Sequence, residues 1–335
     1  MSGKGQGMPI WARSRRTKFI TVYVIAVLVL FFGRQLAYNL RAPGGEPVEN
    51  ALIFISDTDS IDAGRGSNSV YRIGVDGSGM KRLVGSIPHG DDYLRISDID
   101  CDPDSQQLVI ASHRQDLNGF HHAMLDGSGL HLDKPVRGDS LSATRQIALA
   151  PDGVNIIVSR QFEEFREPRF GLVAGDLRSR AYRIIKAPSE AHSYRVPSWS
   201  PTGESIVYVI EVHADEARTI YRMTIGARDG SEERIILETE LAIRDIAWSP
   251  AGDRLALVLD RQVFLFDRYG DKLIKLTDHL GGADAPRWSP DGAQISYVSP
   301  STFAGQNQLY VMNADGSGKR RVVNIRGDLV NGCWV

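Results

Sequence analysis

Short apolar runs separated by glycine-containing turns recur along most of the chain. Runs such as IVYV at 206–209 and QLYVMNA at 308–314 have the length and composition of β-strands. The tetrapeptide DGSG follows such a run three times, at 76–79, 126–129 and 315–318. Asp-Gly between two strand-like stretches favours a hairpin, because Gly accepts a positive φ and Asp bonds its own backbone. A phosphate-binding loop would lead into a helix, and no helical pattern follows, so we interpret DGSG as a turn.

The turns belong to a longer repeat. SWSPTGESIVYV, AWSPAGDRLALV and RWSPDGAQISYV are clear copies, and ALAPDGVNIIVS and DCDPDSQQLVIA are weaker ones. Equivalent positions in successive copies lie 48, 50, 49, 40 and 46 residues apart, a period typical of four-stranded propeller blades. The equivalent positions are Cys101, Leu149, Trp199, Trp248, Trp288 and Trp334.

The repeat predicts an all-β fold, a six-bladed β-propeller of four-stranded blades over residues 51–335, preceded by one N-terminal transmembrane helix. The propeller begins with ALIFISD, which has the pattern of a second strand. The last residues, NGCWV, resemble the missing first strand of the same blade. We expect the two ends to pair within this blade, because an open ring would leave unpaired strand edges.

The N-terminal part has a different pattern. Residues 1–18 are basic, 19–40 contain a long apolar run, and 41–50 have the Pro and Gly content of a linker. Fifteen uncharged residues separate Lys18 from Arg34, a length of about 22 Å as a helix, and these two flanking side chains can reach the headgroups. We interpret 19–40 as a transmembrane anchor in contact with the bilayer; a cleaved signal peptide is the alternative.

Charge is distributed unevenly along the chain. The first 45 residues hold seven Lys or Arg and no acidic residue, which leaves 39 − 7 = 32 basic against 41 acidic residues in the remainder. The basic flank before the apolar run places the N-terminus in the cytoplasm and the propeller in the periplasm or outside the cell. A propeller of about −9 lacks the basic face that nucleic-acid binding requires, so we expect no nucleic-acid partner.

The repeats resemble those of the TolB-type propeller family, also called the WD40-like Pro-Asp repeat. The resemblance is carried by WSPDG at Trp288–Gly292 and by LYVMNADGSGKRRV from Leu309, and it covers roughly residues 51–335. It implies a β-propeller. Prolyl-oligopeptidase-type enzymes pair a similar propeller with a hydrolase domain, but the chain has no G-x-S-x-G nucleophile elbow. We therefore expect a protein that is not an enzyme.

Three further sequence features bear on catalysis and metal binding. GDSLS at 138–142 imitates a hydrolase nucleophile block, but no Asp-x-x-His accompanies it, and it falls between predicted blades. DTDSID, with Asp57, Asp59 and Asp62, lacks the Gly and distal Glu of an EF-hand loop, which favours a solvated acidic loop over a Ca²⁺ site. The histidines show no metal-ligand spacing. We expect no catalytic residue, no metal and no cofactor.

The cysteines and tryptophans of the repeat lie on the predicted innermost strands. An exterior location would permit a disulfide between Cys101 and Cys333. However, Cys101 is equivalent to Trp334, so Cys333 is one residue out of phase, and we expect free buried thiols. Trp199, Trp248 and Trp288 recur at the repeat period and are expected to pack between blades.

These observations favour a non-catalytic, membrane-anchored propeller that acts as an interaction or accessory subunit of a membrane protein complex on the outer (periplasmic) face of the cytoplasmic membrane. Two alternatives stay open: a solute-binding or enzymatic propeller that uses its central pocket, and a TolB-like soluble envelope factor released by signal cleavage. Long variable loops on a rigid scaffold are the usual sites of recognition. The best candidate loop runs between Arg160 and Arg169, and its predicted interaction residues are Phe162, Glu163, Glu164, Phe165 and Arg166.

Overall fold

The computed structural model describes residues 50–335 except 59–67, 86, 90–91, 114–117, 134–143, 163, 215–217, 270–271, 301–305 and 326. The predicted basic head, anchor and linker therefore lie outside the described residues, apart from Asn50 at the end of the linker. Within the described part, no helix has the length and apolar character needed to cross a membrane. Residues 49–335 form one compact unit.

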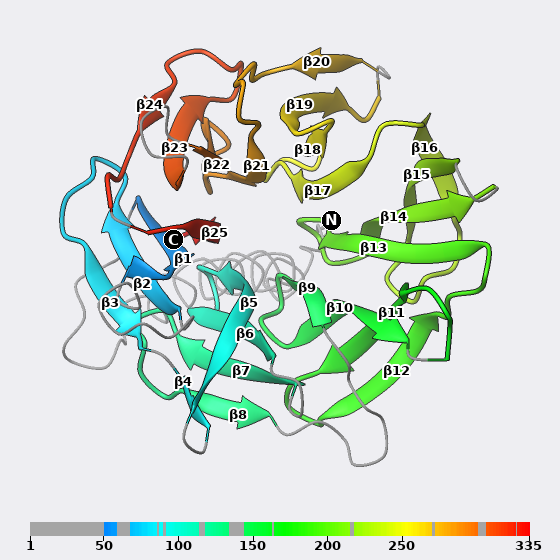
Figure 1. Ribbon diagram of the computed structural model, residues 1–335, viewed down its shortest axis with the longest axis horizontal. Coiled ribbons are helices and arrows are strands. Elements are labelled where there is room, and N and C mark those ends of the chain that lie inside the picture. The colour runs from blue at the N-terminus through cyan, green and yellow to red at the C-terminus, as the bar shows by residue number, and fades with distance from the viewer. Residues whose placement is uncertain are drawn as a thin grey trace, which may run out of the picture. The chain divides into compact units, whose positions relative to one another are not determined.

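The described residues form six antiparallel sheets arranged as blades around a central axis (Figure 1). From the innermost strand outward, blade 1 contains β25 (Leu329–Trp334), β1 (Ala51–Ser56), β2 (Ser69–Gly74) and β3 (Lys81–Val84). Blade 2 contains β5 (Asp92–Asp102), β6 (Gln107–His113), β7 (Asn118–Met124) and β8 (His131–Asp133), with a short extra strand, β4 (Ile87–His89), paired to β5. Blade 3 contains β9 (Thr144–Leu149), β10 (Asn155–Phe162), β11 (Arg169–Asp176) and β12 (Ala181–Lys186).

The remaining blades have the same order. Blade 4 contains β13 (His192–Trp199), β14 (Ser205–His213), β15 (Thr219–Ala227) and β16 (Arg234–Thr239). Blade 5 contains β17 (Ile243–Trp248), β18 (Arg254–Leu259), β19 (Gln262–Asp267) and β20 (Leu273–Lys275). Blade 6 contains β21 (Asp284–Trp288), β22 (Gln294–Pro300), β23 (Asn307–Asn313) and β24 (Arg320–Arg321). The predicted six-bladed propeller is confirmed, and β4 is an addition that the repeat did not predict.

The two ends of the propeller pair with each other. Strand β25 lies antiparallel to β1, and Ala51 and Val335 exchange both backbone hydrogen bonds, each 2.9 Å long. The first and last strands therefore share blade 1, as predicted. The ring has no open gap at this point, and its closure depends on a pairing between residues nearly 300 positions apart in the chain.

The second strands are the most apolar because neighbouring blades cover both of their faces. All six residues of β1 are buried, as are the last five of β18, so these strands are continuous apolar runs rather than alternating ones. The outermost strands have one edge and much of one face in water. Strand β12 accordingly contains no fully buried residue. The core consists of apolar layers between consecutive blades.

Tryptophans of the innermost strands pack blades 4, 5, 6 and 1 against the blade that precedes each of them in the ring. Trp199, Trp288 and Trp334 donate their indole N–H to backbone carbonyls of the preceding blade, at 3.2, 3.2 and 3.0 Å. Trp248 packs in the same way, but its indole nitrogen has no hydrogen-bond partner among the described residues. The predicted packing of Trp199, Trp248 and Trp288 between blades is confirmed.

The expectation of free thiols is wrong, because Cys101 and Cys333 form a disulfide with 6.0 Å between their Cα atoms. The one-residue phase difference between the two cysteines had indicated side chains on opposite faces and hence no pairing. At the tryptophan position of an innermost strand, the side chain points to the preceding blade, as Trp334 does. Cys101 therefore faces blade 1, and Cys333, out of phase in blade 1, points the opposite way, toward blade 2. Facing surfaces of adjacent sheets require this opposite phase.

The DGSG turns also contact the neighbouring blade. Gly77 and Gly127 have φ of 88° and 85°, as the hairpin interpretation requires. A Cβ at Gly77 would lie 2.7 Å from the carbonyl oxygen of Val322 in blade 6, and one at Gly127 would lie 2.4 Å from that of Leu83 in blade 1. These glycines thus permit both the turn and the close approach of the preceding blade's outermost segment.

Candidate functional site

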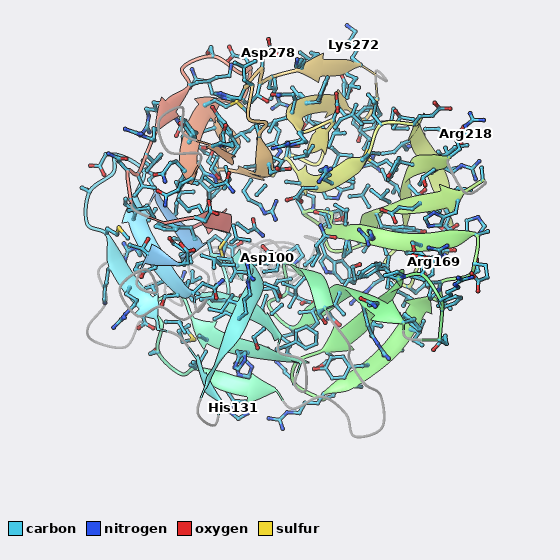
Figure 2. All side chains as sticks on the ribbon, in the orientation of Figure 1. Asp100, His131, Arg169, Arg218, Lys272 and Asp278 are labelled. Atoms are coloured by element: carbon cyan, nitrogen blue, oxygen red, sulfur yellow. A yellow bond between two sulfur atoms is a disulfide. The ribbon has the colours of Figure 1, made fainter. Side chains whose placement is uncertain are left out.

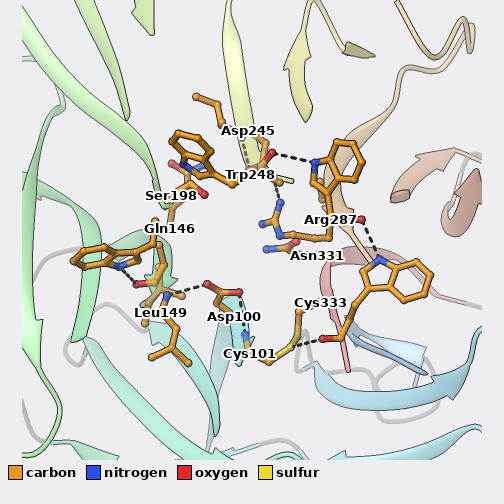
Figure 3. A pocket seen from close by; sticks show the side chains of 18 of the residues that line it. Asp100, Cys101, Gln146, Leu149, Ser198, Asp245, Trp248, Arg287, Asn331 and Cys333 are labelled. Carbon is orange, nitrogen blue, oxygen red and sulfur yellow. Dashed lines mark hydrogen bonds and ion pairs between the residues drawn. A yellow bond between two sulfur atoms is a disulfide. The ribbon is translucent and has the colours of Figure 1, made fainter. Parts of the chain in front are cut away.

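The innermost strands of all six blades surround a central cavity of about 610 Å³ (Figure 3). Its mouth lies on the face where first strands turn into second strands. Prolines of five of these turns surround the mouth, and deeper in the cavity the walls are polar. The rim prolines are Pro103, Pro151, Pro201, Pro250 and Pro290.

The polar side chains of the cavity hydrogen-bond to the exposed backbone edge of the next innermost strand. Asp98 and Asp100 on β5 accept hydrogen bonds from the N–H groups of Ile147 and Leu149 on β9, both 2.8 Å long. Gln146 continues the pattern one blade further, since its side-chain oxygen accepts a 3.0 Å hydrogen bond from the N–H of Val196. An innermost strand has no further strand to pair with, so these side chains satisfy its backbone donors.

Hydrogen bonds and an ion pair continue around the cavity wall. The side-chain amide of Asn331 on β25 donates to the carboxylate of Asp98. Arg287 on β21 forms an ion pair with Asp245 on β17, with 3.0 Å between Nη1 and Oδ2. Figure 3 shows Asp100, Gln146, Asp245, Arg287 and Asn331 converging on the cavity from five different blades.

Burial and the positive charge of Arg287 have opposing effects on the pKa values of Asp98 and Asp100. Burial raises the pKa of Asp98 to about 7 and that of Asp100 to about 6, while the nearby Arg287 guanidinium lowers both. Burial acts to lower the pKa of Arg287, but Asp245, Asp98 and Asp100 together raise it by more, so that Arg287 keeps its positive charge inside the channel. The cavity therefore combines one arginine with carboxyls that titrate near neutral pH.

A second cavity, of about 480 Å³, lies at the opposite end of the channel, next to the loops between second and third strands. Arg95 of blade 2 and Arg244 and Arg261 of blade 5 line it together with Asp284. Burial raises the pKa of Asp284, and Arg244 and Arg261 lower it. Positive and negative side chains thus occur together at this mouth.

The predicted interaction loop joins β10 to β11 in blade 3. Phe162, the last residue of β10, is only 6% exposed, and the guanidinium of Arg160 lies 4.9 Å from the centre of its ring. It is therefore part of the packed base of the loop rather than of its exposed surface. Phe165 is half-buried, whereas Glu164 and Arg166 are exposed. Glu163 lies outside the described residues. The interaction role of the loop stays a prediction.

Asp57 and His121 each have a hydrogen-bond partner within the described part of the propeller. The carboxylate of Asp57 accepts a 2.7 Å hydrogen bond from the N–H of Asp328 and thereby joins two loops. His121 is buried and hydrogen-bonds to Ser112 at 2.8 Å. GDSLS, Asp59, Asp62 and the flanks Lys18 and Arg34 lie outside the described residues. Within the part that the structure describes, His, Cys, Asp and Glu side chains form no cluster of metal-ligand geometry.

Sequence reasoning missed the polar residues of the channel. Asp98 and Asp100 alternate with apolar residues in ISDIDCD, and Asp245 occupies a similar position in IRDIAW. An acidic residue inside a strand with two covered faces is unusual and could have indicated a channel-facing position. Figure 2 contrasts Asp100, near the centre of the ring, with Arg218 and Lys272 at its periphery.

Comparisons with known proteins give partial similarity. No protein-family model matches the chain. It is 27% identical over 112 residues to the Tol-Pal system protein TolB of Gluconobacter oxydans, which covers 32% of this chain and 24% of that protein. It is 30% identical over 106 residues to the uncharacterized peptidase YuxL of Bacillus subtilis, which covers 30% of this chain and 16% of the peptidase. The chain thus spans about a quarter or less of the length of these relatives.

The fold is similar over most of the chain. TolB from Acinetobacter baumannii superposes with a TM-score of 0.65 at 13% identity, over 86% of this chain and 67% of that chain. A ring of closed four-stranded blades around a polar channel defines this protein as a six-bladed β-propeller. The predicted resemblance to the TolB-type propeller family is confirmed by the similarity to TolB proteins, which covers about a third of the chain in sequence and most of it in fold.

Proposed function

We propose that this chain is a non-catalytic interaction subunit of a membrane protein complex in the cell envelope, held at the outer face of the cytoplasmic membrane by residues 19–40. The contacts that the polar groups of the channel make with neighbouring blades support this proposal. Asp98, Asp100 and Gln146 bond to the neighbouring blade, and Arg287 is paired with Asp245. These side chains connect blades, and a rigid ring of this kind is suited to presenting loops to other proteins.

Two further observations fit an envelope protein. The Cys101–Cys333 disulfide is of a kind that persists outside the reducing cytoplasm. The relative from Gluconobacter oxydans is named a Tol-Pal system protein. We therefore infer a partner that is a protein of the envelope, with the loops between second and third strands as the contact surface.

The test is purification of the tagged full-length chain from membranes in mild detergent, followed by native mass analysis. We expect a stoichiometric partner to remain bound to the wild type. A variant with Glu164→Ala, Phe165→Ser and Arg166→Ala should lose it. The control, Arg234→Ala on the exposed outer strand β16, should retain it. Migration of the wild type as a 37 kDa monomer plus micelle at every detergent strength would contradict the proposal.

The size of the central cavity favours a second candidate function, binding of a small polar solute. A cavity of about 610 Å³ is large enough for a metabolite-sized ligand, and carboxyl and guanidinium groups line it. If the chain binds a solute there, a library of polar metabolites should contain a compound that raises the melting temperature of the wild type. Arg287→Lys should abolish that shift.

A further inference from the structure

The Cys101–Cys333 disulfide occupies a special place in the closed ring. The chain between the two cysteines includes most of blade 2, all of blades 3 to 6 and the strand β25. The covalent loop formed by this segment and its disulfide therefore runs once around the whole channel. Strands β1 to β3 lie outside this loop in sequence and are attached to it through β25.

Without the disulfide, only noncovalent contacts hold β25 in place. It pairs with β1, but the register shifts between Phe54 and Ser56, which interrupts the ladder. Its side chains add the hydrogen bonds of Asn331 to Asp98 and of Trp334 to the carbonyl of Arg287. Five of the six residues of β25 are buried, but as the innermost strand it pairs with one other strand only, β1. Opening of this short strand therefore breaks a single ladder, and the disulfide is its one covalent link to blade 2.

We propose that the disulfide is a redox-controlled latch that holds β25 between blades 1 and 2, so that the ring becomes permanently closed only when the two thiols are oxidised. The latch is consistent with the proposed location outside the cytoplasm but requires no partner protein. It assigns the two cysteines a role in ring closure rather than in catalysis.

The chemistry of closing the latch is thiol–disulfide exchange with a small disulfide such as oxidised glutathione. The S–S bond of the small disulfide breaks, the Sγ–Sγ bond between Cys101 and Cys333 forms, and the two cysteine protons leave with the two released thiols. Both cysteines line the central cavity, which gives small thiols and disulfides a route to them. Reduction by dithiothreitol reverses the reaction.

Hydrogen–deuterium exchange of the full-length protein tests the latch. We expect reduction to accelerate amide exchange in β25 and β1 by about 100-fold, since the disulfide no longer limits opening of the strand. Strand β14, on the far side of the ring, should not change and is the internal control. The melting temperature of the whole protein should fall by about 5–15 °C on reduction.

Variants provide the matched control. Cys101→Ser, Cys333→Ser and the double variant should exchange quickly at β25 without reductant and should not respond to it. Equal exchange at β25 in the oxidised and reduced wild type would overturn the latch. So would alkylation of both thiols when cells are treated with iodoacetamide before lysis, because the disulfide would then not exist in the cell. Neither result depends on whether a partner protein is found.

Discussion

At the scale of single residues, each DGSG turn contains two glycines with different surroundings. Gly77 and Gly79 both have positive φ, at 88° and 64°. A side chain at Gly77 would collide with the backbone of blade 6, whereas nothing lies within 4 Å of a Cβ at Gly79. The first glycine is therefore required by the turn and by the blade interface, and the second by the turn alone.

Alanine at the two positions should separate these requirements. Gly79→Ala should cost about 1 kcal/mol of unfolding free energy, the usual penalty for a left-handed conformation. Gly77→Ala should cost about 2–4 kcal/mol, because the Cβ must also push the carbonyl of Val322 away. Urea unfolding of the two variants measures the difference. Equal costs would mean that the interface yields without resistance at this turn.

The buried carboxyls of the channel predict a pH dependence of stability. The folded pKa values of Asp98 and Asp100, about 7 and about 6, lie above the ordinary value of 3.8. The folded protein therefore holds these protons more tightly than the unfolded chain. Their contribution to stability is complete below about pH 4 and is lost as pH rises through about 7.

Asp98→Asn should make the stability less dependent on pH between about 4 and 7, whatever its effect on the absolute free energy of unfolding. Urea titrations across this range measure the slope. Asp126→Asn is the control, because hydrogen bonds from Ser128 lower the pKa of this turn carboxyl. Its contribution is present above the ordinary pKa and is lost only at more acidic pH, so the slope near neutral pH should stay that of the wild type.

At the scale of elements, the sequence was sufficient where each strand or turn has a local cause. The apolar second strands, the Pro-Asp-Gly turns and the strand equivalent to the tryptophan position all appear where the repeat predicts them. The disulfide was not predicted correctly, because pairing across two blades depends on which face of each sheet points to the other. The hydrogen-bond partners of Asp98 belong to blades 1 and 3, so the local sequence could indicate its channel-facing position but not these contacts. The extra strand β4 pairs with β5 and lies outside the repeat pattern.

The C-terminal strand is the element whose removal should matter most. Deleting residues 330–335 removes most of β25 and exposes the edge of β1 and the apolar layer beside Phe54. We expect aggregation or loss of the cooperative unfolding transition. A synthetic peptide of residues 327–335, added during refolding, should restore part of the folded signal in circular dichroism. Melting of the truncated protein at the temperature of the full-length chain would show that β25 does not close the ring.

At the scale of the whole molecule, ring closure joins the two ends of the propeller sequence. The other five blades are each built from one continuous segment, whereas blade 1 takes β25 from the end and β1 to β3 from the beginning. Its formation must overcome the entropy of closing a loop of nearly the whole propeller, although this cost grows only slowly with length. The disulfide fixes β25, the strand on which the formation of blade 1 depends.

A circular permutant should separate the effect of chain order from that of the fold. Joining Val335 to Ala51 through a short linker is geometrically simple, since these residues already hydrogen-bond to each other. New ends between Glu240 and Leu241 would fall in an exposed connection between blades 4 and 5. Blade 1 would then be one continuous hairpin series, while blades 4 and 5 would each remain intact.

We expect the permutant to fold into the same propeller and to depend less on the disulfide than the linear chain of residues 49–335. In the linear chain, reduction frees β25 at the end of the polypeptide; in the permutant, β25 stays tethered to β1. The drop in melting temperature on reduction should therefore shrink from about 5–15 °C to a few degrees. Thermal melts of both proteins with and without dithiothreitol make the comparison. An equally large drop in both would place the effect of the disulfide at the interface between blades 1 and 2, independent of how blade 1 is assembled.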